Sequence, residues 1–185
     1  AMSLGLYVTG TRTARSQDLL GEITTWLRES YATALCATMR AVDDSGRPCL
    51  MVSLHPGAED VVLTQLAEDH LAASAVTSTA GPGYHAYLCA LLHALGATFD
   101  VAWDAEDPHG ETGDENGYFH TKNRAALEDA MARWLAALAT RVRELVAEGH
   151  TGVAISMPEG REYTHDGLVA TPMGPRDAAW LEATC

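Results

Sequence analysis

Alternating apolar and polar residues occupy two runs of the chain, over residues 33–42 and 48–55. A period of two is typical of strands with one buried face. The sequence Asp43-Asp44-Ser45-Gly46, which lies between the two runs, is rich in turn-forming residues. The pattern therefore predicts an antiparallel β-hairpin.

The same pattern predicts the register of this hairpin. If Val42 pairs with Arg47, one face of both strands becomes strongly apolar, whereas a slip of one residue mixes the two faces. The predicted pairs on the apolar face are Leu35 with Leu54, Ala37 with Val52 and Met39 with Leu50. Cys36 and Cys49 do not face each other in this register, so we expect no disulfide between the strands.

Apolar residues recur at helical spacing in three other segments. The first segment runs from Ser16, a residue suited to the N-cap of a helix, to about Ser30. The second covers residues 84–95, and the third and longest covers residues 121–148. On the polar side of the third helix, Asp129 and Arg133 lie four residues apart and are expected to pair.

Further short elements are predicted from the rest of the chain. Apolar runs predict strands at residues 4–9, 98–103 and 152–157, and a last helix is predicted over residues 174–181. Residues 60–79 allow two interpretations, a second hairpin or a helix with Leu63, Leu66 and Leu71 on its apolar stripe. The β-branched residues at both ends of this segment favour the hairpin.

These elements predict an α+β fold in a single domain over residues 1–185. An antiparallel sheet is built on the 33–42/48–55 hairpin, and the helices at 84–95 and 121–148 pack on one face of it. An α/β fold with a parallel sheet is the alternative. The residues expected in the core lie on the apolar face of their own element: Leu35, Met39, Leu50, Val52, Leu54, Leu88, Leu91, Trp134, Leu138 and Leu145.

The charge of the chain restricts its partners. It has 12 Lys and Arg residues against 25 Asp and Glu residues, a formal net charge of -13 at pH 7. A surface this acidic repels phosphate groups, which disfavours nucleic acids and anionic membranes and favours a basic protein partner. No apolar run is long enough for a transmembrane helix, and we expect no signal peptide at the N-terminus.

Four cysteines, Cys36, Cys49, Cys89 and Cys185, are scattered without a Cys-x-x-Cys pair. The sequence therefore predicts neither a zinc ribbon nor a thioredoxin-like redox motif. Free thiols are typical of a reducing compartment, so we expect the protein in the cytoplasm.

The sequence Gly81-Pro82-Gly83 provides a candidate ligand site. A helix that begins here presents unpaired backbone N–H groups, which suit a phosphate or a carboxylate. Tyr84 would form an aromatic wall and His85 would supply a group that titrates near neutral pH. Trp103 and the acidic loop that follows it are expected to approach this helix start, and Arg176 is a further candidate for binding an anion. Because no P-loop or dinucleotide-binding motif is present, a plain helix start is the simpler interpretation.

Histidine and cysteine recur at every fourth position of the helix predicted over 84–95, as His85, Cys89 and His93. These residue types suit zinc, but His85 and His93 would lie about 12 Å apart along the helix axis and cannot bind one ion together. At most a neighbouring pair would bind a metal, with other ligands from elsewhere in the chain. A polar stripe beside the apolar face of the helix is the simpler interpretation.

The loop between residues 104 and 117 is crowded with acidic residues. Their carboxylates suit Ca²⁺ or Mg²⁺, and the candidate ligands are Asp104, Glu106, Asp107 and His109. The EF-hand pattern fails because His109 occupies the position of its required glycine, and a solvated acidic loop is favoured over a metal site. We also expect Asp104 or Asp107 to orient His85.

Two functions remain open for the chain. The first is a binding protein, such as an inhibitor, an immunity-type protein or an adaptor, that engages a basic partner through acidic residues including Glu111, Asp114 and Glu115. The alternative is a small-molecule-binding or metal-assisted enzyme with its site at residues 81–85 and 104–109. The sequence contains no Gly-x-Ser-x-Gly motif and no cysteine in a catalytic context, and it predicts no cofactor.

Overall fold

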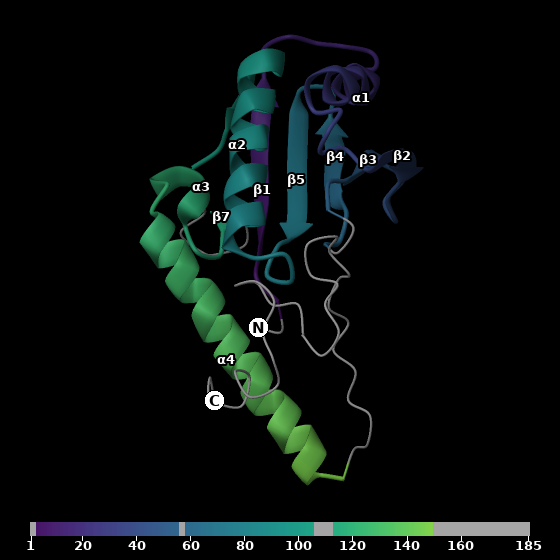
Figure 1. Ribbon diagram of the computed structural model, residues 1–185. Helices are drawn as coiled ribbons and strands as arrows, with labels where there is room; N and C mark the ends of the chain where they lie inside the picture. Colours follow the sequence, from purple (N-terminus) through teal and green to yellow (C-terminus); the bar gives the residue numbers. More distant parts are fainter. Residues whose placement is uncertain (1–2, 56–57, 106–112, 150–185) are drawn as a thin grey trace.

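The computed structural model describes residues 3–55, 58–105 and 113–149. These residues form an antiparallel sheet of seven strands and four helices (Figure 1), which is the predicted α+β fold. In chain order the elements are β1 (Gly5–Arg12), α1 (Leu19–Ser30), β2 (Ala37–Val42), β3 (Pro48–Ser53), β4 (Val61–Ala67), β5 (His70–Val76), α2 (Pro82–Phe99), β6 (Val101–Trp103), β7 (Gly113–Asp114), α3 (Tyr118–Thr121) and α4 (Arg124–Ala147). The strand and the helix predicted over 152–157 and 174–181 lie outside the described residues.

The first strand of the chain, β1, is an interior strand of the sheet, with neighbouring strands on both sides. The strand order is β2-β3-β4-β5-β1-β6, and β7 also pairs with β1. β6 pairs with the end of β1, from Gly10 to Arg12, whereas β7 pairs with Leu6 and Tyr7 near its beginning. The short strands β6 and β7 therefore share the edge of the sheet beside β1.

The predicted hairpin is present as β2 and β3, but the predicted register is wrong by one residue. Val42 lies opposite Pro48, and Met39 lies opposite Met51. The turn explains the shift. The backbone N–H of Asp43 donates to the carbonyl of Arg47, which leaves residues 44–46 as the loop, and Gly46 has a φ of 78°. A three-residue loop that ends in a left-handed glycine is a common hairpin connection, whereas the predicted pairing requires a four-residue loop.

This shift changes which residues of β2 lie beneath α1. Arg40 lies opposite Leu50, and its guanidinium donates to the carboxylate of Asp18 at the start of α1. Thr38 lies opposite Val52 and accepts a hydrogen bond from Arg28 near the end of α1. Met39, which was expected in the core, is 57% exposed on the other face.

The two interpretations of residues 60–79 are now distinguished. The segment forms the hairpin of β4 and β5, in which Val62 pairs with Ser74 and Leu63 with Ala73. Leu63 and Ala73 are buried, whereas Val62 and Ser74 point to the less buried face. The favoured interpretation of this segment is confirmed.

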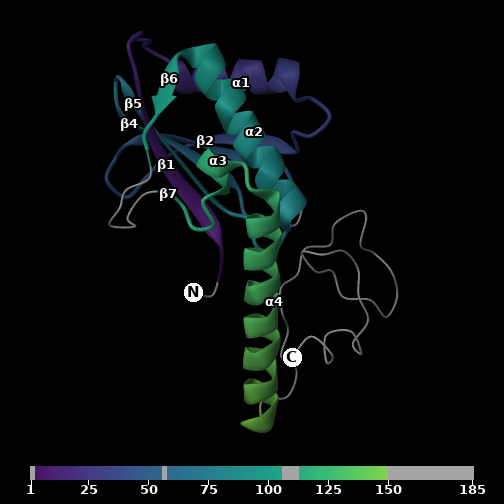
Figure 2. The same cartoon turned by 90° about the vertical axis from the view of Figure 1, so that its left-hand side faces the viewer.

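α1 and α2 lie on the same face of the sheet, and no described helix lies on the other face (Figure 2). We call this second face the helix-free face. The core lies between the sheet and the two helices and includes the predicted residues Leu50, Val52, Leu54, Leu88 and Leu91. Leu35 packs against this core and is partly buried.

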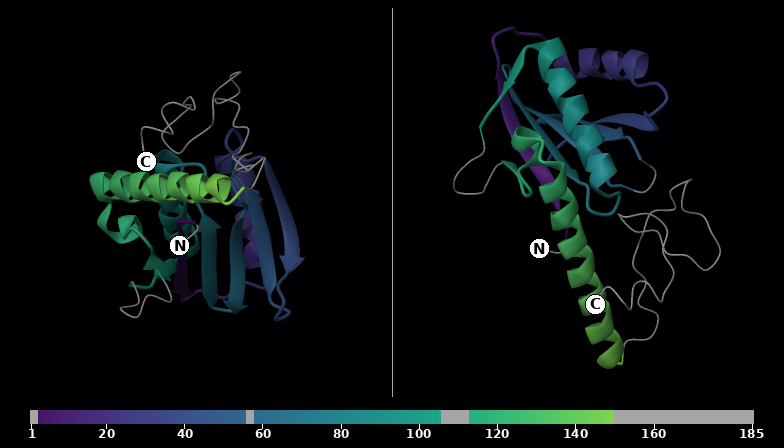
Figure 3. Two further views of the ribbon diagram at one scale, coloured as in Figure 1. Left: turned by 90° about the horizontal axis from the view of Figure 1, so that it is seen from below. Right: turned by 60° about the vertical axis from the view of Figure 1, so that its left-hand side comes forward.

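α4 begins beside α2, and its C-terminal half extends away from the sheet (Figure 3). Trp134, near the middle of the helix, is buried as predicted. Leu138 and Leu145 were expected in the core but are only half-buried. The predicted pair on this helix is confirmed, with Arg133 Nη1 2.8 Å from Asp129 Oδ2.

Three predicted element boundaries are wrong. α1 begins after Asp18, whose carboxylate accepts a hydrogen bond from the N–H of Gly21, so Ser16 is not the N-cap. α2 continues to Phe99 and ends at Asp100, which has left-handed backbone angles, so only Val101–Trp103 of the strand predicted over 98–103 remains. The helix predicted over 121–148 begins only at Arg124, because Lys122 also has left-handed backbone angles and separates the short helix α3 from α4. No helix in the described parts of the chain is both long and apolar enough to cross a membrane.

Candidate functional site

The start of α2 is built by a tight turn that follows β5. The backbone N–H of Gly81 donates to the carbonyl of Thr77. Gly81 is the N-cap of the helix and has a φ of 95°, a backbone conformation that residues with a side chain rarely adopt. Pro82 follows at the first helical position, where its missing N–H leaves no hydrogen bond unmade. This turn reverses the direction of the chain and brings the side chain of Thr77 into contact with that of His85, in the first turn of the helix.

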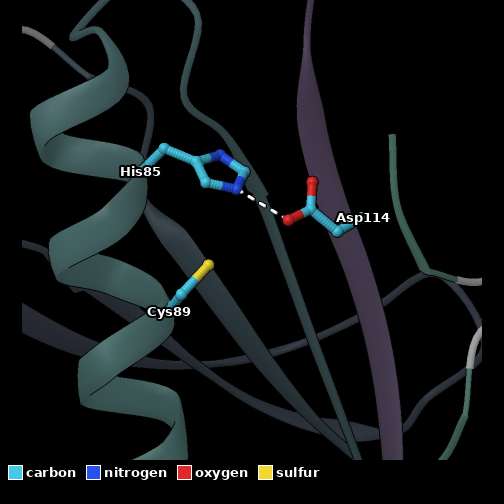
Figure 4. Close-up of side chains that lie close together, drawn as sticks. All are labelled: His85, Cys89 and Asp114. Atoms are coloured by element: carbon cyan, nitrogen blue, oxygen red, sulfur yellow. Dashed lines mark hydrogen bonds and ion pairs between the residues drawn. The ribbon is translucent and has the colours of Figure 1, made fainter. Parts of the chain in front are cut away.

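His85 is fully buried between a hydroxyl and a carboxylate. Its Nδ1 atom lies 2.7 Å from Thr77 Oγ1, and its Nε2 atom lies 2.8 Å from Asp114 Oδ2 (Figure 4). Thr77 is also fully buried, and Asp114 is buried apart from a small fraction of its surface. The imidazole is therefore fixed at both nitrogens in a site that is closed to bulk water.

Asp114 is held in place by the backbone around it. Its Oδ2 atom accepts a hydrogen bond of 2.7 Å from the N–H of Phe119, and its Oδ1 atom accepts one of 3.2 Å from the N–H of Asn116. The pairing of β7 with β1 places Asp114 opposite Leu6, a core residue. A carboxylate that accepts several hydrogen bonds can be buried at a tolerable cost.

Cys89 completes this cluster from the next turn of α2. It lies four residues after His85, so both side chains leave the same side of the helix. Burial is the main cause that raises the pKa of the Cys89 thiol, and the charge of Asp114 raises it further. One ligand atom each from His85, Cys89 and Asp114 lies within 4.8 Å of the other two, so these three residues could hold a metal ion.

His93, the third member of the predicted stripe, does not join the cluster. Its Nε2 atom lies 2.8 Å from the carbonyl oxygen of Phe119, and its ring stacks on the Phe119 ring at 4.3 Å. The expectation that at most a neighbouring pair of the stripe could share an ion agrees with this geometry.

The carboxylate beside His85 is not the expected one. Asp104 accepts a hydrogen bond of 2.7 Å from the hydroxyl of Thr9, whereas Asp114 contacts His85. Asp107 lies outside the described residues, as do the other candidates Glu106, His109 and Arg176. Because Asp114 is buried, it cannot contact a basic partner in the way expected from its place in an acidic loop.

The remaining predicted ligand residues lie apart from one another. Tyr84 packs against the core, and its buried hydroxyl has no hydrogen-bond partner in the structure. Burial raises the pKa of Tyr84. Trp103 donates from Nε1 to the carbonyl of Leu92, in the second half of α2, so it does not approach the helix start at Gly81. Gly83 is exposed.

Comparison of the chain with models of protein families, with curated proteins and with solved structures finds no significant match to any of them.

Proposed function

We propose that this protein binds a basic partner protein on the helix-free face of its sheet. The observation that carries the proposal is a row of side chains that crosses five strands of this face. The row follows from the register and contains Tyr7, Ser74, Val62, Met51 and Met39. Met39 and Tyr7, at its two ends, are 57% and 38% exposed. Exposed aromatic residues and methionines are typical of protein interfaces.

The charges near this face favour a basic partner. Asp104 is exposed and bonded to Thr9, which shares the helix-free face with Tyr7. Further exposed acidic residues lie in the turns between strands, among them Asp44, Glu59 and Asp69. The two arginines of the described strands, Arg12 and Arg40, already donate hydrogen bonds within the protein. Arg12 donates to the carbonyl of Phe99, and Arg40 donates to the carboxylate of Asp18. An acidic rim around an apolar strip attracts a partner whose apolar contact surface is bordered by Lys or Arg.

The enzyme alternative has less support. His85 is the titratable residue expected to act on a small ligand, and its two ring nitrogens are occupied by Thr77 and Asp114 below the surface. A general base must reach the proton that it removes. The free cysteines Cys36, Cys49 and Cys89 further support a reducing compartment, and we propose the cytoplasm.

The proposal is tested with two tyrosines of equal exposure on different surfaces. Tyr7 on the helix-free face is 38% exposed, and Tyr87 on α2 is 40% exposed. The wild type, Tyr7→Ser, Met39→Ser and Tyr87→Ser are used as baits at low salt, and retained proteins are identified, purified and titrated against each bait. We expect a basic protein whose affinity falls by about tenfold or more with Tyr7→Ser or Met39→Ser and stays unchanged with Tyr87→Ser.

The second part of this test measures the affinity of the partner at increasing salt concentration. A partner held by charge complementarity loses affinity as the salt concentration rises. If every captured protein is acidic, or if Tyr87→Ser weakens binding as much as Tyr7→Ser does, the proposed surface is wrong.

A further inference from the structure

We propose that His85, Cys89 and Asp114 form a binding site for one Zn²⁺ ion. The site lies beneath the helices, on the opposite side of the sheet from the surface proposed for the protein partner. The two proposals are therefore independent of each other.

The backbone brings these three ligands together from two distant segments. His85 and Cys89 are four residues apart on α2, and Asp114 lies on β7, which is held against β1. Figure 4 shows the Cys89 sulfur and the His85 imidazole on the side of α2 that faces Asp114. Their ligand atoms lie within 4.8 Å of one another. Ligand atoms of a tetrahedral zinc site are about 3.3–3.8 Å apart, so the 2.8 Å contact between His85 and Asp114 must widen slightly and any longer separation must shorten.

The chemistry of the ligand set selects the metal. A thiolate, an imidazole and a carboxylate together suit Zn²⁺, whereas Ca²⁺ and Mg²⁺ prefer sites made only of oxygen. This site differs from the hard-cation site predicted at residues 104–109, which has no sulfur ligand. A water molecule would supply the fourth ligand of a tetrahedral zinc ion.

The residues around the ligands are arranged as those of metal sites usually are. A histidine that binds a metal through one nitrogen generally donates the hydrogen of the other nitrogen to a nearby acceptor. Thr77 Oγ1, which lies 2.7 Å from His85 Nδ1, provides that acceptor. Asp114 in turn accepts hydrogen bonds from the N–H groups of Phe119 and Asn116. The imidazole and the carboxylate are thus oriented before an ion arrives.

Binding of the ion changes the protonation of two ligands. The thiol of Cys89 loses its proton to solvent as the sulfur becomes a thiolate ligand. In the ion-free site Nε2 of His85 carries the hydrogen that the Asp114 carboxylate accepts, because a carboxylate only accepts. On binding, Nε2 loses this hydrogen and Nδ1 carries the hydrogen of the neutral ring, which Thr77 accepts. The lone pair of Nε2 then binds the ion, and the ion replaces the hydrogen bond between His85 and Asp114. Because the ligands are buried, the chain acquires the ion as it folds or when the site opens locally.

The test uses the full chain without a histidine tag. The protein is stripped with a chelator, dialysed and titrated with Zn²⁺ alone and with Co²⁺ alone. We expect one ion per chain, a higher Tm with Zn²⁺ and the near-ultraviolet absorption of a cobalt–thiolate bond. Cys89→Ala should abolish this absorption, whereas Cys49→Ala, which removes another buried cysteine, should keep it. Thr77→Val should weaken Zn²⁺ binding about 10–100-fold through the orientation of His85.

The wild-type cobalt spectrum decides the question without any variant. A chain that binds no Co²⁺ or Zn²⁺ at millimolar concentration, or that binds Co²⁺ without a thiolate band, does not have this site. A thiolate band that survives Cys89→Ala and disappears with Cys49→Ala also overturns the proposal.

Discussion

The two faces of the sheet differ in the burial and the hydrogen bonding of their polar side chains. Beneath the helices, Thr77, His85 and Asp114 are buried and bonded to one another. On the helix-free face, Ser74 lies in a row with Met51 and is only partly buried. A polar group under the helices needs a protein partner because water is excluded, whereas a group on the helix-free face can bind water.

This difference determines what each face can bind. A buried cluster with three ligand atoms can accept something as small as a metal ion, but it cannot contact another protein. The exposed row can contact a protein, but it has no buried polar group with which to fix a small ligand. Changes on the two faces should therefore affect different properties of the molecule.

The largest expected effect compares two neighbours of equal size on β3. Leu50 is fully buried beneath the helices, and Met51 is half-buried on the helix-free face. Leu50→Ala removes a core side chain and leaves a cavity, so it should lower the free energy of unfolding by about 2–5 kcal/mol. Met51→Ala removes less buried surface and should cost about 1 kcal/mol. Urea unfolding followed by circular dichroism measures both.

Equal losses for Leu50→Ala and Met51→Ala would mean that both faces are covered in solution. In that case the helix-free face would be occupied, for example by a second copy of the chain. Repeating the measurement at several protein concentrations distinguishes this outcome, since the stability of an oligomer depends on concentration.

The second prediction concerns the polar groups of the two faces. Thr77→Val removes the hydroxyl that contacts His85 Nδ1 and leaves a buried nitrogen without its partner, at a cost of about 1–3 kcal/mol. Thr64→Val is the matched change on β4, where Thr64 lies opposite Cys49 on the helix-free face. It should change the stability by less than about 0.5 kcal/mol. Chemical denaturation of metal-free protein gives both values, and a larger loss for Thr64→Val would contradict the assigned faces.

The sequence pattern predicted the α+β fold because the apolar residues of the longer strands and helices recur at the period of their own element. Leu50 and Val52 are buried as their spacing indicates, and the leucines of α2 face the core. The pattern could not determine the register of the first hairpin, because Met39 on the exposed edge strand has the hydropathy of a core residue. The register depends on the left-handed conformation of Gly46, and a Gly at this place suits loops of more than one length.

The candidate site was only partly predictable for a different reason. His85 and Cys89 were singled out by their spacing on one helix, which is a local signal. Asp114 belongs to a strand of two residues, Gly113–Asp114, which is too short to have a period. Its neighbours in the sequence are acidic, so the local pattern indicates a solvated loop. Only the pairing of β7 with β1 brings Asp114 beneath α2.

The last and smallest prediction tests the edge of the sheet where β2 meets α1. Asp18 accepts a hydrogen bond from Arg40, and this contact, followed by the N–H of Gly21, lowers the pKa of Asp18 below its ordinary value of 3.8. The carboxylate therefore contributes stability at pH values above 3.8, and this contribution is lost as the pH falls through the folded-state pKa. Asp18→Asn keeps an oxygen for the N-cap but removes the charge.

We therefore expect the wild type to have a slightly higher Tm than Asp18→Asn at pH 7, and this difference should shrink as the solution is acidified below about pH 4. Thermal unfolding at a series of pH values measures it. The effect is small because the pair is exposed and surface ion pairs are weak. Arg40→Gln supplies the control, since Asp18→Asn should have a much weaker pH dependence in that background. A difference that grows on acidification, or that is unaffected by Arg40→Gln, would show that Arg40 does not bind Asp18, and would remove the support for the observed register at this edge.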